Sequence, residues 1–391
     1  MFLKRKHKPE RKTILLIGNI SKSLYEFRGD LLRELVNSNF EVYVAASDLD
    51  EGSPYWDLLR GLGVQACNIH FKRDSLNIFL EIQAIFKFIK TINLIKPDVI
   101  FLYNIKPTLY GLIASMLAKV PIRISMITGI GTMFYHLEET NQPTFKQKTF
   151  KTLYSFFLKT SSIILFQNND DLKLFLKEGI ISNDNKSLVI NGSGINLAKF
   201  SFSPLPETIS FLFAGRFIKS KGIKEFFRAA IYLKSKYPRA VFKIAGWSDD
   251  SIDSIEANVL EEIKNSKEIA YLGYSRKLDN EIKKSTVFVL PSYREGTPRS
   301  VLEAMAIGRP IITTFAPGCK ETVIHNYNGM LIKPKSTSSL IRAMKLFLDG
   351  SLNEVDNKRF ALNSRKLAER KYDVIQINKS ITKIINQALN Y

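Results

Sequence analysis

The sequence predicts an α/β protein made of two doubly wound domains, and three observations support this fold class. The chain has 391 residues, more than one hydrophobic core usually organises, so we expect two domains. Residues 12–20, KTILLIGNI, form an apolar strand that ends in a glycine turn, and a helical pattern and a second strand follow. The same order returns from residue 209, which implies two Rossmann-like parallel sheets.

The first domain is expected over residues 1–195, with the strand EVYVAAS after its first helix. Residues 196–208 are expected to be a linker, because NGSGINLAKFSFSPLPET (191–208) is rich in Gly, Ser and Pro and loses periodicity. The second domain, 209–355, contains the strand ISFLFAGRF (209–217), the helix GIKEFFRAAIYLKSKY and the strand VFKIAG (241–246). In open sheets of this type ligands bind at the carboxyl ends of the strands, so a cleft is expected between the domains.

The charge predicts an anionic partner. The formal net charge is +20, and six of the first twelve residues are Lys or Arg. Nucleotide phosphates, lipid headgroups and nucleic acid all satisfy that charge. The only cysteines, Cys67 and Cys319, are far apart and no secretory signal is present, which favours a reducing cytoplasm.

Two segments have the pattern of helices that lie on a membrane surface. No apolar run reaches the ~18 residues that span a bilayer. Residues 76–96 and 145–166, however, alternate aromatic or aliphatic positions with Lys, as interfacial helices do. A helix with one core-facing side and one basic, solvated side fits the same pattern.

Several common sites are excluded by spacing. Neither domain's first strand is followed by the G-x-G-x-x-G of a dinucleotide fold, and no G-x-x-x-x-G-K-[ST] loop is present. The four histidines do not cluster with Cys or carboxylates at metal-ligand spacing. They are His7, His70, His136 and His325.

The segment AGRFIKSKG places Arg216 and Lys221 on a turn that opens a helix. Two cations beside helix N–H groups suit a diphosphate, because Arg offers a planar fork, Lys a mobile charge and the helix end a partial positive charge. A solvated basic loop would have the same sequence.

The segment PSYREGTPRSVLEAMAIGRP (291–310) places two carboxylates around a helix start. Residues 286–292 are expected to form a buried strand, with Thr297 as N-cap and Pro298 as the first helical residue. Glu295 then lies in the loop and Glu303 about a turn and a half into the helix. Both carboxylates could face one ligand with paired hydroxyls, or be a loop charge and a helix-surface charge.

These residues resemble a known family. Glu295 and Glu303 in EGTPRSVLE match the E-x7-E motif of glycosyltransferase family 4, retaining sugar-nucleotide transferases of the GT-B fold. NGMLIKP (328–334) and AGRFIKSKG agree, and the resemblance covers roughly residues 209–335. It implies that Glu303 holds the ribose hydroxyls, that Glu295 contacts the transferred sugar, and that Arg216 and Lys221 bind the diphosphate.

The resemblance also implies further donor-site residues. Gly215 lies in the diphosphate turn, and the amides of Gly296 and Thr297 are expected to hold phosphate or sugar. Gly273, in the strand end YLGYS (271–275), is expected to meet the base. In this fold the last helix commonly crosses back, so residues 356–391 are expected to return to the first domain.

The first half resembles a narrower branch, the enzymes that add hexose or N-acetylhexosamine to lipid-linked oligosaccharides of bacterial capsule, O-antigen and N-glycan. The matching segments are YEFRGDLLREL (25–35), YNIKPTLYGLIA (103–114) and ITGIGTMF (127–134). Acceptor-side residues expected from this likeness and from position are Arg28, Gly29, Lys106, Thr128 and Gly129. Many family members carry a His near the last segment, but this sequence has none at that turn, and His136 is given no catalytic role.

The expected function is therefore retaining transfer of a hexose or N-acetylhexosamine from a nucleotide sugar, UDP-linked by family likeness, to a polyprenyl-diphosphate-linked glycan. No D-x-D motif lies in a suitable loop, so we expect no metal and no cofactor, with Arg216 and Lys221 stabilising the leaving diphosphate. An anionic membrane surface is the expected partner, at the cytoplasmic face of the plasma membrane. Two alternatives remain: a sugar-nucleotide epimerase of similar fold, and a basic nucleic-acid-binding protein.

Overall fold

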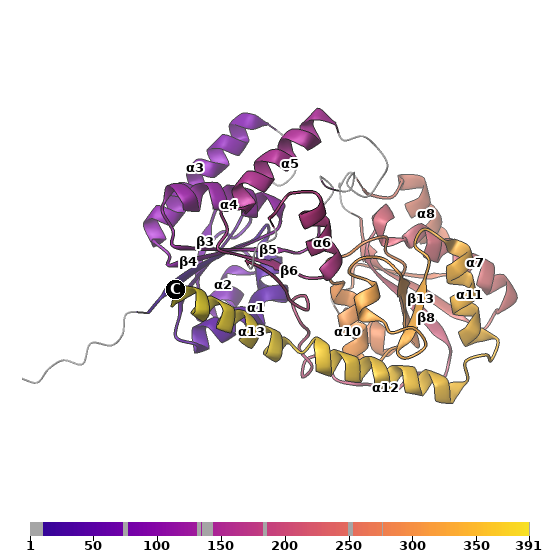
Figure 1. Ribbon diagram of the computed structural model, residues 1–391. Coiled ribbons are helices and arrows are strands. Elements are labelled where there is room, and N and C mark those ends of the chain that lie inside the picture. The colour runs from indigo at the N-terminus through magenta and orange to yellow at the C-terminus, as the bar shows by residue number, and fades with distance from the viewer. Residues whose placement is uncertain are drawn as a thin grey trace, which may run out of the picture. The chain divides into compact units, whose positions relative to one another are not determined.

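The computed structural model describes residues 11–72, 77–130, 134, 144–182, 186–248, 253–275 and 277–390. The chain divides into two compact units. In Figure 1 the first part of unit 1 runs from indigo to magenta, unit 2 runs from magenta to yellow, and α13 of unit 1 is yellow. Unit 1 comprises Met1–Ile190 and Ile375–Tyr391, and unit 2 comprises Asn191–Val374. The chain therefore passes between the units twice.

Unit 1 is built on a seven-stranded sheet in the order β3-β2-β1-β4-β5-β6-β7, and all of its strand pairs are parallel. Its strands are β1 Thr13–Ile17, β2 Glu41–Ala46, β3 Gln65–Asn68, β4 Val99–Tyr103, β5 Ile122–Ile127, β6 Ile163–Phe166 and β7 Ser187–Val189. Its helices are α1 Ser21–Asn37, α2 Trp56–Arg60, α3 Ile78–Ile95, α4 Ile105–Leu117, α5 Phe145–Leu158, α6 Asn169–Lys177 and α13 Val374–Leu389. The segment expected as one amphipathic stretch, 145–166, is thus α5 followed by β6.

Helices cover both faces of this sheet. One apolar cluster joins α1, α2 and α13 to one face, and a second joins α3, α4, α5 and α6 to the other. Strands buried on both faces read as continuous apolar runs, and the central strand β4, VIFLY, is buried along its whole length. The last helix completes the first cluster with Ile377, Ile381 and Ile385, which recur every four residues on one helix face.

Unit 2 is built on a six-stranded parallel sheet in the order β10-β9-β8-β11-β12-β13. Its strands are β8 Ser210–Arg216, β9 Val241–Trp247, β10 Ala270–Gly273, β11 Val287–Leu290, β12 Ile311–Thr314 and β13 Gly329–Ile332. Its helices are η2 Lys219–Lys221, α7 Ile223–Lys236, α8 Ala257–Asn265, α9 Leu278–Lys283, α10 Arg299–Ile307, η3 Lys320–Thr322, α11 Thr337–Leu348 and α12 Glu354–Lys371. A single apolar cluster holds this unit together.

The unit boundaries differ from the expected ones for packing reasons. The expected linker, 196–208, lies inside unit 2, because Phe200 is buried in that unit's core. The expected crossing segment begins at residue 375 and not at 356, because α12 packs Phe360 and Ala368 into the same core. The residues around the two passages pair with each other: Ile195 N–H donates to the carbonyl of Tyr372 (2.7 Å), and Val374 N–H donates to that of Ile195 (3.1 Å).

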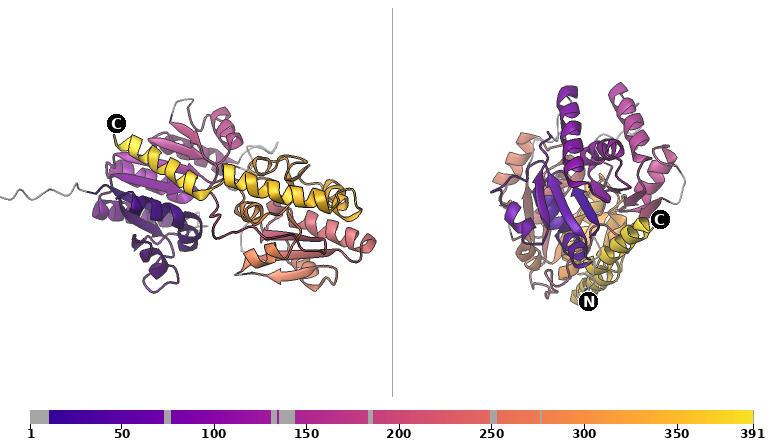
Figure 2. Two further views of the ribbon diagram at one scale, coloured as in Figure 1. Left: turned by 90° about the horizontal axis from the view of Figure 1, so that it is seen from below. Right: turned by 90° about the vertical axis from the view of Figure 1, so that its left-hand side faces the viewer.

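Figure 1 and the left panel of Figure 2 show α12 and α13 as successive helices in yellow. The residue between them that ends α12, Tyr372, is buried and donates its hydroxyl to the Glu321 carbonyl (2.6 Å). Among the helices that the structure describes, none has both the length and the apolar character needed to cross a bilayer.

Candidate functional site

Strand order brings the turn after β8 and the loop after β11 to the same edge of the unit 2 sheet. The two strands are parallel neighbours, with Val287 opposite Phe211 and Phe288 opposite Leu212. After β8 the chain makes the 3-10 turn η2 and enters α7, and after β11 it forms a loop over residues 291–298 and enters α10. Segments more than 70 residues apart in sequence therefore meet at the carboxyl ends of the strands.

The start of α7 requires a glycine. Gly222 has φ +71°, a left-handed conformation, and a Cβ on this residue would lie 2.2 Å from the Pro291 carbonyl oxygen. A side chain here would force the two loops apart. The glycine that opens α7 therefore fixes how closely the β8 turn approaches the β11 loop.

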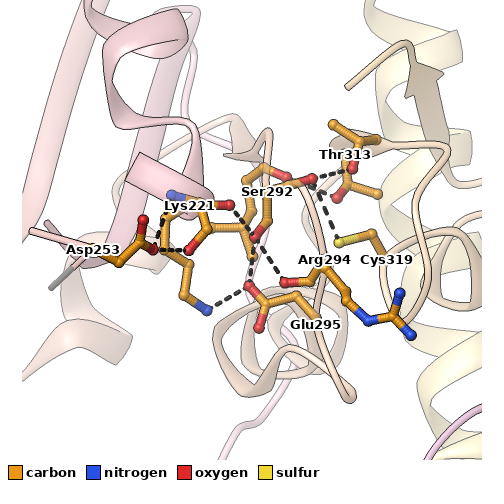
Figure 3. A network of polar contacts seen from close by, with 10 residues as sticks. Lys221, Asp253, Ser292, Arg294, Glu295, Thr313 and Cys319 are labelled. Atoms are coloured by element: carbon orange, nitrogen blue, oxygen red, sulfur yellow. Dashed lines mark hydrogen bonds and ion pairs between the residues drawn. The ribbon is translucent and has the colours of Figure 1, made fainter. Parts of the chain in front are cut away.

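The central contact of the site joins Lys221 to Glu295. The ammonium of Lys221, at the end of η2, donates to Oε1 of Glu295 in the β11 loop, as Figure 3 shows. Ser292 Oγ donates to the same carboxylate oxygen at 2.8 Å. The two charged side chains are only 19% and 12% exposed, so their attraction is weakly screened by water.

Backbone hydrogen bonds hold both loops in place around that pair. Tyr293 N–H donates to the Ser220 carbonyl (2.7 Å), and Ser292 Oγ lies 2.9 Å from the same carbonyl. Ser220 in turn donates its hydroxyl to Asp253, visible on the left of Figure 3. The β11 loop is thus held to the β8 turn by hydrogen bonds between residues that are far apart in the sequence.

Cys319 is a free, buried thiol next to the loop after β11. Its Sγ is 4.0 Å from the Ser292 carbonyl oxygen, and the side chain is fully buried. Burial, and then the negative charge of Glu295, raise the pKa of the Cys319 thiol to about 12. A thiol that stays protonated is a poor nucleophile and metal ligand.

The second glutamate has its own cation. Arg299 Nε is 3.3 Å from Oε1 of Glu303 one turn later in α10, and Arg299 Nη1 donates to the Gly194 carbonyl at 2.9 Å. The same chain segment approaches the helix start again, because a Cβ on Gly192, which has φ +68°, would lie 2.8 Å from Cβ of Thr297. Glu303 is therefore oriented by an arginine anchored on residues 192–194.

The helix that carries Glu303 begins one residue later than expected. Thr297 was expected to be the N-cap, but Pro298 occupies that position with φ −71° and ψ 109°. The Pro298 carbonyl accepts the first helical bonds, from Val301 N–H (3.1 Å) and Leu302 N–H (3.2 Å). The fixed φ of proline suits a helix start, and proline has no backbone N–H, a group that would find no partner within the helix at this position.

Neither helix start at this edge has a side-chain cap within the described residues. The first-turn N–H groups of α7 and α10 then supply partial positive charge where β8 and β11 end. Together with Lys221 this is a favourable environment for an anion.

Arg216 and Gly215 end β8, opposite Trp247 and Gly246 of β9. The Arg216 side chain is exposed, in contrast to that of Lys221. Gly273 ends β10 in a left-handed conformation, φ +60°. The structure thus distributes the expected donor residues along the carboxyl ends of β8, β10 and β11.

Sequence reasoning missed an aromatic pair at this edge. Trp247 ends β9 and Tyr274 follows β10, and their rings meet edge to face with centroids 5.5 Å apart. Both side chains are substantially exposed, although aromatic rings of this size usually prefer burial. The signal in the sequence was an aromatic residue at the carboxyl end of each of two neighbouring strands, Trp247 as the last residue of β9 and Tyr274 directly after β10.

In unit 1, Arg28 and Gly29 are packing residues. The buried Arg28 guanidinium lies 5.1 Å from the ring centroid of Tyr103, with Nη2 2.8 Å from Sδ of Met126. Gly29 is also buried, where a Cβ would meet the Leu62 side chain at 3.6 Å. The α1 segment places both residues against the inside of the unit.

Lys106 already has an anionic partner. Its ammonium lies 2.8 Å from Oε1 of Glu81 and also donates to the Lys72 carbonyl at 3.1 Å. Lys106 belongs to the first turn of α4 and Glu81 to that of α3, so the ion pair joins the two helix beginnings.

Thr128 and Gly129 follow β5 and lie beside two asparagines that sequence reasoning missed. Asn104, after β4, places Nδ2 3.5 Å from Thr128 Oγ1, and its Oδ1 accepts from the Asn19 N–H at 3.3 Å. Asn104 has φ +68° and ψ +153°, which is strained for a residue with a side chain, and such strain gathers at functional sites. Gly131 and Thr132 of the TGIGT turn, and His136, lie outside the described residues.

In the part of the chain that the structure describes, no three His, Cys, Asp or Glu side chains gather in a way that would hold a metal ion. The unit 2 edge presents cations, carboxylates and backbone N–H groups. A lysine and two helix starts favour a diphosphate, and two carboxylates with separate orientations favour hydroxyl groups.

Comparison with protein families gives one match for each unit. A family model described as Glycosyl transferases group 1 matches residues 197–367, and one described as Glycosyl transferase 4-like matches residues 13–168. The first contains every donor-site residue named above, and the second contains β1 to β6 of unit 1. Between them the models span most of the chain.

Two curated relatives align along nearly their whole length. An N,N'-diacetylbacillosaminyl-diphospho-undecaprenol alpha-1,3-N-acetylgalactosaminyltransferase of Campylobacter jejuni is 28% identical over 379 residues, which cover 93% of this chain and 94% of the relative. A UDP-Gal:alpha-D-GlcNAc-diphosphoundecaprenol alpha-1,3-galactosyltransferase of Escherichia coli is 26% identical over 358 residues, 88% of each chain.

Solved structures confirm the predicted GT-B fold. HepE from Anabaena, crystallised with UDP and glucose, matches 96% of this chain and 100% of its own with a TM-score of 0.78 at 17% identity. The lipopolysaccharide outer core galactosyltransferase WaaB matches 96% of this chain and 99% of its own with a TM-score of 0.67 at 16% identity. At such identities the likeness concerns the fold.

Proposed function

We propose that this chain, which belongs to the group 1 glycosyl transferases, moves a hexose or N-acetylhexosamine from a nucleotide sugar to a polyprenyl-diphosphate-linked glycan. The reaction would take place during synthesis of a bacterial surface polysaccharide or a related glycan. The observation that carries the proposal is the Lys221–Glu295 contact between two uncapped helix starts, at the carboxyl ends of β8 and β11. Both full-length relatives carry the names of transferases that act on undecaprenyl-diphosphate-linked glycans.

On the donor side, each ligand group has a matching protein group at one sheet edge. The diphosphate would bind Lys221, Arg216 and the N–H groups at the starts of α7 and α10, since all four carry positive charge or positive dipole ends. The ribose hydroxyls would donate to Glu303. The amides of Gly296 and Thr297 lie in the loop between the two glutamates and would contact phosphate or sugar.

The base would bind where β9 and β10 end. Gly273 exposes its backbone there, and the rings of Trp247 and Tyr274 offer a face or an edge to a planar base. UDP is the proposed carrier, supported by the family likeness and by the name of the Escherichia coli relative, which uses UDP-Gal.

Transfer would retain the anomeric configuration. The bond between sugar C1 and the diphosphate oxygen breaks, and a bond from C1 to the acceptor oxygen forms on the same face. The proton of the acceptor hydroxyl passes to the leaving diphosphate. Lys221 and Arg216 would stabilise the negative charge that develops there, so no divalent metal is required. Glu295, held by Lys221 and Ser292, would orient the transferred sugar through its hydroxyls.

On the acceptor side, the polar cluster at the carboxyl ends of β1, β4 and β5 is the proposed contact for the acceptor sugar. Asn19 Oδ1 is buried with no hydrogen-bond partner among the described residues, and Asn104 is held in a strained conformation next to Thr128. A hydroxyl of the acceptor would satisfy an acceptor atom of this kind.

Incubation with a panel of radiolabelled sugar nucleotides and lipid-linked acceptors tests the proposal. We expect one labelled lipid-linked product, unchanged yield in EDTA, and an anomeric configuration in the product that matches the donor. Isomerised nucleotide sugar formed without acceptor would instead identify an epimerase. Loss of turnover in EDTA would contradict metal independence, and tight RNA binding without any transfer would contradict the enzyme class.

A further inference from the structure

Helix α3 carries apolar side chains on two opposite faces. Ala84, Phe88 and Ile92 are buried against the sheet of unit 1. On the face turned away from the sheet, Phe79 is 80% exposed and Phe86 is 66% exposed. The exposed apolar side chains of the helix are Phe79, Leu80, Ile82, Phe86 and Leu94. A helix on the surface of a soluble domain normally has charged and polar residues in those positions.

Helix α5 repeats this arrangement. Tyr154 and Leu158 are buried in the same apolar cluster as α3. Phe145 and Phe156, which lie three turns apart on the opposite side, are 84% and 63% exposed, and Leu153 is exposed between them. The side chains that give α5 its second apolar face are therefore accessible to solvent.

The two helices belong to one surface. Both pack against α4, and all three helices cover the same face of the unit 1 sheet. Figure 1 and the right panel of Figure 2 show α3 and α5 standing side by side on that face of unit 1. Their exposed faces will be called the α3/α5 surface.

Lysines accompany the aromatic rings on this surface. The lysines on the two helices, or directly at their ends, that form no ion pair within the described residues are Lys87, Lys90, Lys96, Lys146, Lys148 and Lys159. The only carboxylate on either helix is Glu81, and it is paired with Lys106. The surface is therefore both apolar and cationic.

We propose that the α3/α5 surface docks on an anionic lipid bilayer, with Phe79, Phe86, Phe145 and Phe156 inserted into the interface. Burial of the aromatic rings at the level of the headgroups is favourable because it removes apolar surface from water. The aliphatic part of each lysine side chain can extend so that its ammonium group contacts the anionic headgroups. The proposal deepens the proposed function, because a membrane surface is where a lipid-linked acceptor resides.

The chemistry of the surface favours lipid over a protein partner. Lysine is depleted at the centres of protein interfaces, where aromatic residues gather without it. Here lysines lie among the phenylalanines on both helices, which is the composition of helices that bind membrane interfaces. A second copy of the chain would also bring its own lysines against these lysines.

Insertion can be measured directly with tryptophan probes. Phe86→Trp and Phe156→Trp each place an indole on the α3/α5 surface, and Val355→Trp places one at a matched position on α12 of unit 2, where Val355 is 73% exposed. With vesicles of phosphatidylcholine and phosphatidylglycerol we expect a blue shift and quenching by brominated lipid for the first two variants only. Equal quenching in all three would overturn the proposal.

A depletion variant separates docking from catalysis. Phe79→Ser/Phe86→Ser/Phe145→Ser/Phe156→Ser should partition onto anionic vesicles at least about tenfold less than the wild type. The control Val355→Ser/Leu362→Ser, on an exposed side of α12, should partition normally. Transfer to a short-chain, water-soluble acceptor without vesicles should be the same in all three proteins.

The outcomes of this experiment are distinct. Wild-type partition in the depletion variant, equal wild-type partition onto neutral phosphatidylcholine, or a wild-type dimer that the depletion variant abolishes would each overturn the docking proposal. Absence of transfer to the soluble acceptor in the wild type, with docking intact, would instead contradict the proposed function. Thermal unfolding of the variants should match the wild type, since the replaced side chains are exposed.

Discussion

The ammonium of Lys221 donates a hydrogen bond to the carboxylate of Glu295, and this contact joins the turn after β8 to the loop after β11. Each charge is largely removed from water and is neutralised by the other. A diphosphate that binds Lys221 must therefore share the ammonium with Glu295. The carboxylate is thus coupled to the diphosphate site through the same lysine.

Replacing Lys221 should destabilise unit 2 as well as weaken donor binding. Lys221→Ala leaves the Glu295 carboxylate with Ser292 but without its cation, and we expect a loss of about 1–3 kcal/mol in the free energy of unfolding. The double variant Lys221→Ala/Glu295→Gln should regain part of that loss, because the uncompensated charge is gone. Urea denaturation of the wild type, the two single variants and the double variant gives the coupling energy between Lys221 and Glu295. If the effects of the two single substitutions simply add up, the predicted coupling is contradicted.

The two glutamates should differ in kinetics. Glu303→Ala removes the proposed ribose contact, so KM and the Kd for the nucleotide should rise about tenfold or more, equivalent to ~1.4 kcal/mol, with little change in kcat. Glu295→Ala removes a contact to the transferred sugar and should mainly lower kcat. Steady-state kinetics combined with calorimetry of nucleotide binding checks both values. Similar changes in KM and kcat for the two variants would refute the division of roles.

Arg299 should act through Glu303. Its Nε orients that carboxylate and its Nη1 is bound to the Gly194 carbonyl, so Arg299→Gln should raise KM about threefold to tenfold while kcat stays close to wild type. Arg359→Gln is the matched control, because Arg359 forms an exposed pair with Asp356 of the same helix. If Arg299→Gln changes KM no more in the wild type than in a Glu303→Ala background, the proposed link is absent.

Alkaline pH should destabilise the folded protein through its two thiols, the buried Cys319 and the partly buried Cys67. Burial raises the folded-state pKa of Cys319 from its ordinary value of 9.0 to about 12. The folded thiol keeps its proton where the unfolded thiol has lost it, so the contribution to stability is complete below pH 9 and is lost as pH rises toward 12. At pH 10.5 the thiol of the folded protein is still protonated, whereas that of the unfolded chain is ionised. Ionisation therefore stabilises only the unfolded state and lowers the free energy of unfolding by about 2 kcal/mol.

Cys319→Ala tests this explanation. The variant is expected to have a lower stability at pH 8, because a side chain leaves the core, but a shallower fall between pH 8 and pH 10.5. Cys67→Ala should reduce the slope in the same direction, since burial raises that thiol's pKa to about 12 as well. Parallel slopes for wild type and both variants, measured by thermal unfolding at fixed salt, would rule out this cause.

The sequence was sufficient to predict the two sheets and their parallel strands, because strands such as β4 and β8 contain runs of apolar residues that are buried on both faces of a sheet. It was not sufficient to pair Lys221 with Glu295. That contact depends on β8 and β11 being neighbours in a sheet whose order does not follow the chain. Local spacing carries no information on strand order.

The missed residues have similar explanations. Asn104 directly follows β4 and Trp247 is the last residue of β9. Asn104 is distinguished by its backbone angles and Trp247 by its exposed ring, and a sequence displays neither property. Residues 356–391 were expected to cross between the units because residues 356–390 have a helical pattern and the last helix of this fold commonly crosses back. The break at Tyr372 and Asp373 is set by the bridge between Ile195 and Asp373, a tertiary contact.

Because α13 is the last helix to be synthesised, the core of unit 1 can be completed only at the end of translation. The N-terminal residues of unit 1 leave the ribosome first, but Ile377, Ile381 and Ile385 of its core are made last, after all of unit 2. Until then the emerging chain leaves uncovered the apolar side chains of α1 and of the sheet that pack with those isoleucines. Unit 2 is therefore the first unit able to finish its core, and the half-made protein is the form most in need of a chaperone.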